Sequence, residues 1–289
     1  ALPPETLQTM LTRDAEWVRR YVYGKFSRGE GAIHTIPNEC ILNVEPEWVH
    51  NWIKDAALCR VLDHGVTAPT CCTWWASKKG IYLGYREYYQ PDKLVSYHRA
   101  RITELSEDEL YTSNLADPQI FKKSQEKYGG FWTTANEYGD TRMCDSKPVY
   151  WSPADNNEFA TRNRINEYLR KYPDLFHPIT NEKGAPKIYF CKKTPHYENG
   201  MIHIIRETNS QKKKLLAEIN GRKVYCDERE DSVSDHAYDT LRYFCASHLH
   251  FRGEPAPKYK PSSFMAVRNR IAALAQLGKF DLYGCPRTG

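Results

Sequence analysis

The chain has 289 residues, of which 40% are hydrophobic, and a formal net charge of +5 at pH 7. This length and composition supply a sizeable core, which excludes a chain that is disordered throughout. No apolar stretch approaches the roughly 18 residues of a membrane span, so a transmembrane protein is also excluded. The mildly basic charge permits nucleic-acid binding without demonstrating it.

The cysteines and the N-terminus indicate the compartment. Nine cysteines are scattered along the chain without paired C-x₂-C motifs, which disfavours zinc and is typical of reduced, buried thiols in a cytosolic protein. The start, Ala1-Leu2-Pro3-Pro4, lacks the charged segment and apolar core of a signal peptide, so we expect a protein that is not secreted. It also lacks an initiator methionine, so we expect a processed or excised fragment.

Hydrophobic periodicity and turn residues predict the elements of the first half of the chain. We expect an N-terminal helix, three consecutive strands, a second helix and a fourth strand that ends at Asp117. Lys79-Gly80 supplies the turn between the second and third strands, and Pro118 stops the fourth. The expected ranges are, in order, 7–23, 59–63, 70–76, 81–89, 94–105 and 110–117.

The second half adds alternating helices and strands after a loop-like stretch over 122–148. Pro173 is expected to end the first of these helices, and Asn220-Gly221 predicts a hairpin turn. From Gly253 the composition is that of a linker, followed by a short amphipathic helix over 264–277. The order predicts an α/β domain with a mixed sheet. The other expected ranges are a short strand at 149–151, a helix at 156–172, a strand at 187–191, a short helix at 201–207, hairpin strands at 212–218 and 222–226, and a helix at 234–251.

Three acidic clusters stand at the ends of these elements. Asp63 closes one apolar strand, Asp117 closes another, and Asp235-His236-Ala237-Tyr238-Asp239 opens the last helix. Carboxylates at two strand ends and one helix start can converge on one point, where their oxygens suit Mg²⁺ or Mn²⁺. Taken singly, each aspartate is more often a cap that binds local backbone amides. Taken together they predict a metal-dependent nuclease, because two closely spaced metal ions can clamp a phosphodiester.

A succession of motifs surrounds these acids. In chain order they are Leu62-Asp63-His64-Gly65, Pro69-Thr70, Tyr85-Arg86-Glu87-Tyr88-Tyr89, Ala116-Asp117-Pro118 and Asp235-His236-Ala237-Tyr238-Asp239-Thr240-Leu241-Arg242-Tyr243. This succession resembles the nuclease domain of the large subunit of tailed-bacteriophage terminases, and its last motif is the most specific. The resemblance implies an RNase H-like fold, with a mixed sheet flanked by helices. It also implies an endonuclease that cuts concatemeric viral DNA during genome packaging.

The resemblance further implies a domain organisation and partners. Residues 1–54 resemble the end of the terminase ATPase domain and its linker, 55–252 the nuclease domain, and 253–289 form a C-terminal tail. The ATPase motor is then expected upstream of this fragment. The implied partners are double-stranded DNA, the terminase small subunit and the portal, without a membrane. The implied location is the cytoplasm of the host cell.

Carried over residue by residue, the resemblance implies a two-metal site. Asp63 matches the first acid and is expected to bridge both ions, Asp117 matches the second acid, and Asp239 is the expected third. All three are therefore expected to be catalytic. His236, one helical turn before Asp239, suits Mn²⁺ better than Mg²⁺ as a ligand. Asp235 either ligates metal or caps the start of the helix.

Two further positions near Asp63 bear on this site. Many relatives carry an additional acid just before the Pro-Thr step, where this chain has Ala68. An acid in that place would support the second ion, so the number of ions stays open here. His64 either approaches the metal or supports the site from behind, which is the commoner role of such a histidine.

Basic residues in and near the predicted hairpin are the candidates for DNA contact. Such residues can neutralise phosphates, which gives sequence-independent binding that weakens with salt. Solvated lysines that protect an edge strand fit the same pattern. Arg242, three residues after Asp239, either contacts phosphate or pairs with an acid. The candidates are Lys212, Lys213, Lys214, Arg222, Lys223 and Arg242.

Two other functions fit parts of the pattern. Another RNase H-like nuclease, of the resolvase or transposase type, would use the same acids. A non-catalytic module that docks DNA or the packaging motor would use them only as caps. Metal-dependent nicking of a plasmid separates the two catalytic functions from the docking module.

Overall fold

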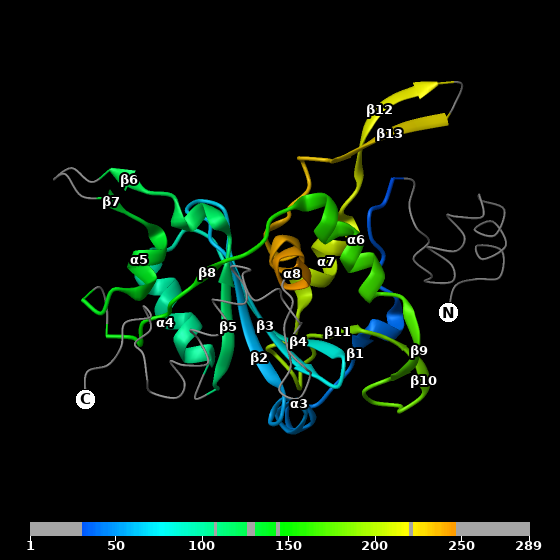
Figure 1. Cartoon of the computed structure of the whole chain (residues 1–289), viewed down its shortest axis with the longest axis horizontal. Helices are drawn as coiled ribbons and strands as arrows, with labels where there is room; N and C mark the ends of the chain where they lie inside the picture. Colours follow the sequence, from blue (N-terminus) through cyan, green and yellow to red (C-terminus); the bar gives the residue numbers. More distant parts are fainter. Residues whose placement is uncertain (1–30, 107–108, 126–130, 143–144, 220–221, 247–289) are drawn as a thin grey trace, which may run out of the picture. The chain divides into compact units, whose positions relative to one another are not determined.

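The centre of the fold is a mixed seven-stranded sheet (Figure 1). The computed structural model describes residues 31–106, 109–125, 131–142, 145–219 and 222–246. Across the sheet the strands run in the order β1-β11-β4-β3-β2-β5-β8. Their bounds in that order are Ile41–Leu42, Ile188–Cys191, Ile81–Gln90, Thr70–Lys78, Ala57–Asp63, Tyr111–Ala116 and Ser152–Pro153.

The strand directions identify the fold class. β2, β3 and β4 form an antiparallel meander, in which Lys79 and Gly80 turn with positive φ angles of 51° and 77°. β5 then pairs parallel to β2, and β8 parallel to β5. Numbered along the chain, these five strands give the spatial order 3-2-1-4-5 of an RNase H-like sheet. The fold class predicted from the sequence is confirmed.

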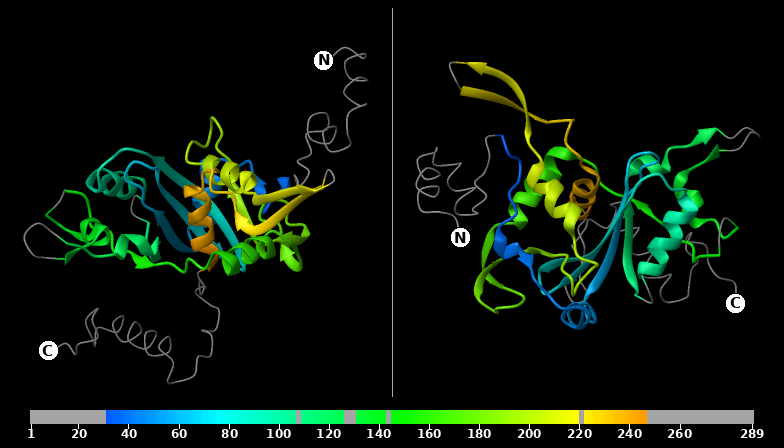
Figure 2. Two further views of the ribbon diagram at one scale, coloured as in Figure 1. Left: turned by 90° about the horizontal axis from the view of Figure 1, so that it is seen from above. Right: turned by 180° about the vertical axis from the view of Figure 1, so that it is seen from behind.

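Helices cover both faces of the sheet (Figure 2). Along β2, Leu58 and Leu62 pack into one core with residues of α3, α4 and α5, whereas Cys59 and Val61 pack into a second core with α6, α7 and α8. This alternation follows from the two-residue period of a strand. It also places Asp63 on the α8 side. The helices are α3 (Pro46–Ile53), α4 (Val95–Ser106), α5 (Thr134–Gly139), α6 (Glu158–Tyr168), α7 (Ile202–Ser210) and α8 (His236–Ala246).

α8 is the helix that matters most for the site, and its apolar side chains hold it against the sheet. The neighbours Ala237 and Tyr238 are buried, as are Leu241 and Phe244, one and two turns further along the helix. The ring of Phe244 stacks on Trp75 of β3, with 4.2 Å between ring centroids. The start of the helix is thereby fixed next to the end of β2.

Three expectations about elements are wrong. The stretch 122–148, expected as loop, contains α5 and the short strands β6 (Ser124–Gln125) and β7 (Phe131–Trp132). α5 begins with a capping box between Thr133 and Asn136. In a helix of only six residues, this local signal is weak. The strand expected at 149–151 lies at Ser152–Pro153.

The third difference is the end of α6. It ends at Tyr168, and Lys171–Phe176 forms β9, paired with β10 (Lys183–Pro186). A residue before proline avoids the helical region, so Pro173 excludes the helix from Tyr172 as well. Pro173 then sits within β9, one of the two strands of this small separate sheet.

The hairpin predicted around 220–221 is present as β12 (Lys213–Ile219) and β13 (Arg222–Arg229), a separate two-stranded sheet. Residues 31–54 contribute β1 and α3, so the sheet and its core extend upstream of residue 55. The predicted helices at 7–23 and 264–277, the linker from Gly253 and the hairpin turn itself lie outside the described residues. Within the described part, none of the helices has the length and apolar character needed to cross a membrane.

Candidate active site

Two of the predicted acids meet at one end of the sheet. Asp63 is the last residue of β2, and Asp117 directly follows β5. These strands are parallel neighbours, with Leu62 opposite Ala116, and the amide of Asp117 donates to the carbonyl of Leu62 at 3.0 Å. The carboxyl ends of parallel strands lie at the same edge of a sheet, so Asp63 and Asp117 both stand at that edge.

The third cluster joins them through α8. His236 opens the helix, and its Nδ1 lies 3.0 Å from Oδ2 of Asp63, although 173 residues separate the two in sequence. Asp239 follows one turn later, with its amide donating to the carbonyl of Asp235. The fold thus brings Asp63 and His236 of the third cluster together.

Electrostatics show that the three carboxylates share one region. The pKa of Asp63 is raised to about 6, chiefly by burial; the hydrogen bond from His236 opposes the rise, and the charges of Asp239 and Asp117 contribute to it. Burial also raises the pKa of the Tyr243 phenol, and Asp239, Asp117 and Asp63 all add to that effect. Negative charge is therefore concentrated beside a buried tyrosine.

Two arginines compensate part of this charge. Oδ1 of Asp239 accepts from Arg229 at 3.0 Å and from Arg242 at 2.9 Å. Arg229 also donates to Oδ2 of Asp235 at 2.7 Å. Burial raises the pKa of Asp239, and the two guanidinium groups act in the opposite direction. Arg242 is 4% exposed, so of its two predicted roles the structure favours pairing with an acid.

The alternative role of the aspartates as caps holds for one of them. Oδ1 of Asp117 accepts from the amide of Gln119 at 2.8 Å and caps a short 3₁₀ helix, Pro118–Phe121. Asp235 directs its carboxylate to Arg229. The first amides of α8, those of Ala237 and Tyr238, donate instead to Glu207 of α7.

The donor set fits a hard divalent cation. Aspartate oxygens are the ligands that Mg²⁺ and Mn²⁺ take, and an imidazole beside them suits Mn²⁺. The negative charge that the arginines leave uncompensated favours a cation. Among the described residues, no three His, Cys, Asp or Glu side chains are yet close enough together to hold an ion. An ion held by Asp63, Asp117 and Asp239 would require their carboxylates to turn toward a common point.

His64 supports the loop after β2. Its Nδ1 lies 3.2 Å from the hydroxyl of Tyr138 and 3.3 Å from that of Thr70. Burial, and to a lesser degree the neighbouring His98, lower the pKa of His64 to about 4, so the ring is neutral at pH 7. The loop itself needs Gly65, because a Cβ there would lie 2.3 Å from the carbonyl oxygen of Ala68.

The basic residues of the hairpin are partly neutralised. Nζ of Lys213 lies 2.6 Å from Asp227, and Nζ of Lys214 lies 4.0 Å from Glu228, both across the two strands. Lys212 and Lys223 are exposed, and Arg222 opens β13. Contact of these residues with DNA stays a prediction.

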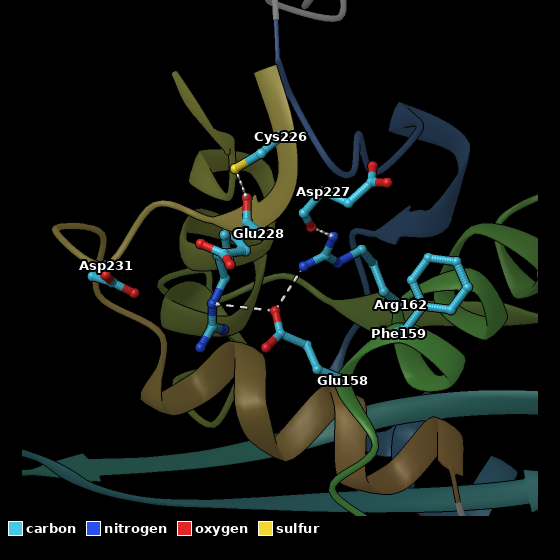
Figure 3. A pocket seen from close by; sticks show the side chains of 8 residues that line it. Glu158, Phe159, Arg162, Cys226, Asp227, Glu228 and Asp231 are labelled. Carbon is cyan, nitrogen blue, oxygen red and sulfur yellow. Dashed lines mark hydrogen bonds and ion pairs between the residues drawn. The ribbon is translucent and has the colours of Figure 1, made fainter. Parts of the chain in front are cut away.

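A cavity of about 570 Å³ lies between the hairpin and α6 (Figure 3). Arg162 is held there by Glu158 and by the carbonyl of Asp227, at 2.7 and 2.6 Å. Arg229 belongs both to this cavity and to the acid cluster. Acids outnumber arginines in the lining, so the cavity does not suit a phosphate. The lining residues are Glu158, Phe159, Arg162, Cys226, Asp227, Glu228, Arg229 and Asp231.

Sequence reasoning missed Arg229 and Glu207. Arg229 lies in the charged run Glu228-Arg229-Glu230-Asp231, where nothing in the sequence distinguishes it from a solvated residue. Glu207 ends a segment predicted as a short helix, and its long-range partners depend on the packing of that helix. No local pattern could have found either residue.

Comparisons with known proteins give matches only among solved structures. No protein family and no curated protein matches the chain. The large terminase of a thermophilic bacteriophage aligns with 85% of this chain and 52% of its own, at 16% identity and a TM-score of 0.48. The chain therefore spans about half the length of that protein.

Two nuclease domains align over nearly their whole length. The large terminase nuclease domain of bacteriophage SPP1, solved with bound Mn, aligns with 72% of this chain and 97% of its own, at 13% identity and a TM-score of 0.43. The large terminase nuclease domain of P22 aligns with 76% of this chain and 93% of its own, at 12% identity and a TM-score of 0.45.

Proposed function

We propose that the protein is a divalent-metal-dependent DNA endonuclease of the terminase large-subunit kind, with Asp63, Asp117 and Asp239 as its catalytic acids. One observation carries the proposal. Asp63 and Asp117 end neighbouring parallel strands, and His236, at the start of α8, lies 3.0 Å from Asp63. If Asp63 served only as a cap, it would have no reason to lie beside a histidine 173 residues away.

The proposed ligands are Asp63, Asp117 and Asp239, with His236 and Asp235 beside them. When bound, one or two Mg²⁺ or Mn²⁺ ions would stabilise the charge that develops on the phosphate and lower the pKa of a bound water. His236 orients the Asp63 carboxylate through its hydrogen bond.

The proposed substrate and partners are inferred from the resemblance of the motifs around these acids to those of terminase large subunits. The enzyme would cut concatemeric viral double-stranded DNA during genome packaging, together with a terminase small subunit, a portal and an ATPase domain. The proposed DNA contacts are made by the exposed Lys212 and Lys223, with Arg222 and the paired Lys213 and Lys214 beside them. Because these contacts are to phosphate, the binding would weaken with salt.

Nicking of supercoiled plasmid with Mg²⁺, Mn²⁺ or a chelator tests the proposal. Alanine at Asp63, Asp117 or Asp239 is expected to abolish cleavage, because each removes a charge that the metal needs. Asp174→Ala is the matched control, since that carboxylate is 97% exposed on the β9–β10 hairpin and activity should persist. Cleavage by any two of the three site variants would contradict the assignment.

The same assay separates the alternatives. A folded protein that binds DNA but cuts it with neither metal favours the docking module. A strong preference for branched DNA over linear duplex favours an enzyme of the resolvase type.

A further inference from the structure

Glu207 of α7 is a buried carboxylate that holds the start of α8. It is 5% exposed, and its Oε2 accepts from the amides of Ala237 and Tyr238 at 2.7 and 3.1 Å. Its Oε1 accepts from the hydroxyls of Tyr89 and Ser234, both at 2.8 Å. A negative charge is favoured at a helix N-terminus, and four donors replace the water that the carboxylate has lost.

The amides that Glu207 binds directly follow the candidate metal ligand His236. The direction of this first turn of α8 decides where the imidazole points, and Nδ1 of His236 lies 3.0 Å from Asp63. Asp239 stands on the next turn of the same helix. A small change in the direction of α8 therefore moves both side chains relative to the strand that carries Asp63.

The start of α7 is capped by a buried carboxylate in the same way as the start of α8. Glu87 of β4, with a side chain 3% exposed, accepts from the amides of His203 and Ile204 at 2.9 and 2.8 Å and so caps α7. Tyr89, two residues further along β4, stacks on the ring of His203 with 4.0 Å between centroids. Because Tyr89 also donates to Glu207, β4 fixes α7, and α7 in turn fixes α8.

We propose that Glu207 is a positioning residue for the active site, and that Glu87 acts on the site through α7. This inference rests on the proposed function, because the centre that Glu207 positions is the proposed metal site. Both carboxylate oxygens of Glu207 are needed, because two amides and two hydroxyls donate hydrogen bonds to them. A glutamine offers a single acceptor oxygen and cannot receive all four.

The test compares Glu207→Gln, Glu87→Gln and the double variant with Glu109→Gln. Glu109 is a matched control, because it is also a largely buried carboxylate that accepts from Tyr85 and Arg86, beside Tyr111 at the start of β5. The ¹⁵N shift of the His236 Nδ1 atom in the metal-free protein reports the contact with Asp63. Mn²⁺ affinity by calorimetry reports the site.

Glu207→Gln is expected to shift the His236 signal and to weaken Mn²⁺ binding by about tenfold. Glu87→Gln should act in the same direction and less strongly. The double variant should be no worse than Glu207→Gln alone, because both act through one contact. Glu109→Gln should change neither readout, even if it lowers thermal stability by as much as Glu207→Gln does.

A wild-type His236 signal and wild-type Mn²⁺ affinity in Glu207→Gln would overturn the inference. If that variant does not fold, Tyr89→Phe takes its place, because it removes one donor to Glu207 and keeps the ring on His203. Unchanged readouts in Tyr89→Phe would then count against the inference. A wild-type protein that binds no Mn²⁺ contradicts the proposed function, whereas the metal-free His236 signal still decides the positioning role.

Discussion

At the scale of single residues, Arg229 supplies a positive charge to two acids of the candidate site, Asp235 and Asp239. Asp63 and Asp117 could be placed at one edge of the sheet because each ends an apolar run, and the two strands proved to be parallel neighbours. Arg229 could not be foreseen. Its guanidinium reaches Asp239 and Asp235 only because the hairpin strand β13 ends beside α8.

Replacing Arg229 by alanine is expected to make stability depend on metal. Its guanidinium is 15% exposed and binds two acids that would be left without this partner. Loss of a partner to a largely buried charge costs about 1–3 kcal/mol, so the metal-free variant should unfold at lower urea. Mn²⁺ replaces the missing positive charge, so the stabilisation on adding Mn²⁺ should exceed that of the wild type.

Urea unfolding with chelator and with Mn²⁺ measures both effects. Arg142→Ala is the control, because this arginine is 80% exposed in its pair with Asp140 and its loss should leave stability almost unchanged. An Arg229 variant that Mn²⁺ stabilises no more than the wild type would contradict the expectation.

At the scale of elements, strong local signals were enough for most of the fold. The strand meander, α4, α7, the β12–β13 hairpin and α8 all lie where alternation, helical spacing or turn residues predict them. α5 was missed because six residues carry almost no periodicity. The predicted end of α6 was wrong because Pro173 acts on the residue before it, and the next segment pairs as a strand.

The hairpin gives a prediction about DNA binding at this scale. Lys213 is paired with Asp227 at 2.6 Å, so part of its charge is unavailable to phosphate. Asp227→Asn should free Lys213, tighten binding to duplex DNA a few-fold at low salt and steepen the salt dependence by up to about one phosphate contact. Asp174→Asn makes the same change of charge on the β9–β10 hairpin, where Lys183 lies 3.9 Å away.

Fluorescence anisotropy over a series of salt concentrations compares the two variants. Tighter binding in Asp227→Asn alone places DNA on the β12–β13 hairpin. An equal gain in both variants would reflect net charge only and would remove the hairpin from the proposed interface.

At the scale of the whole molecule, burial of polar groups in the two cores lowers the stability of the fold at low pH. Helices cover both faces of the sheet, so polar groups between the layers are shielded from water. His98 of α4 is fully buried, and its Nδ1 lies 2.7 Å from the hydroxyl of Tyr88. The predicted sheet order implies such a layered core. The sequence does not reveal that His98 lies within this core, because the local pattern of α4 does not distinguish it from an exposed residue of the same helix.

Burial lowers the pKa of His98 from 6.5 to about 4. In the unfolded chain this ring therefore binds a proton below pH 6.5. In the folded chain it binds a proton only below about pH 4. Stability is fully retained above pH 6.5 and is lost as the pH falls from 6.5 to 4, with a slope of at most about 1.4 kcal/mol per pH unit.

His98→Gln keeps a polar partner for Tyr88 and removes the titration, so its stability should fall less over this range. Urea unfolding at pH 7, 6, 5 and 4 measures the difference, with His196→Gln on the surface as the control. Parallel pH profiles for wild type and His98→Gln would show that His98 is not the group responsible.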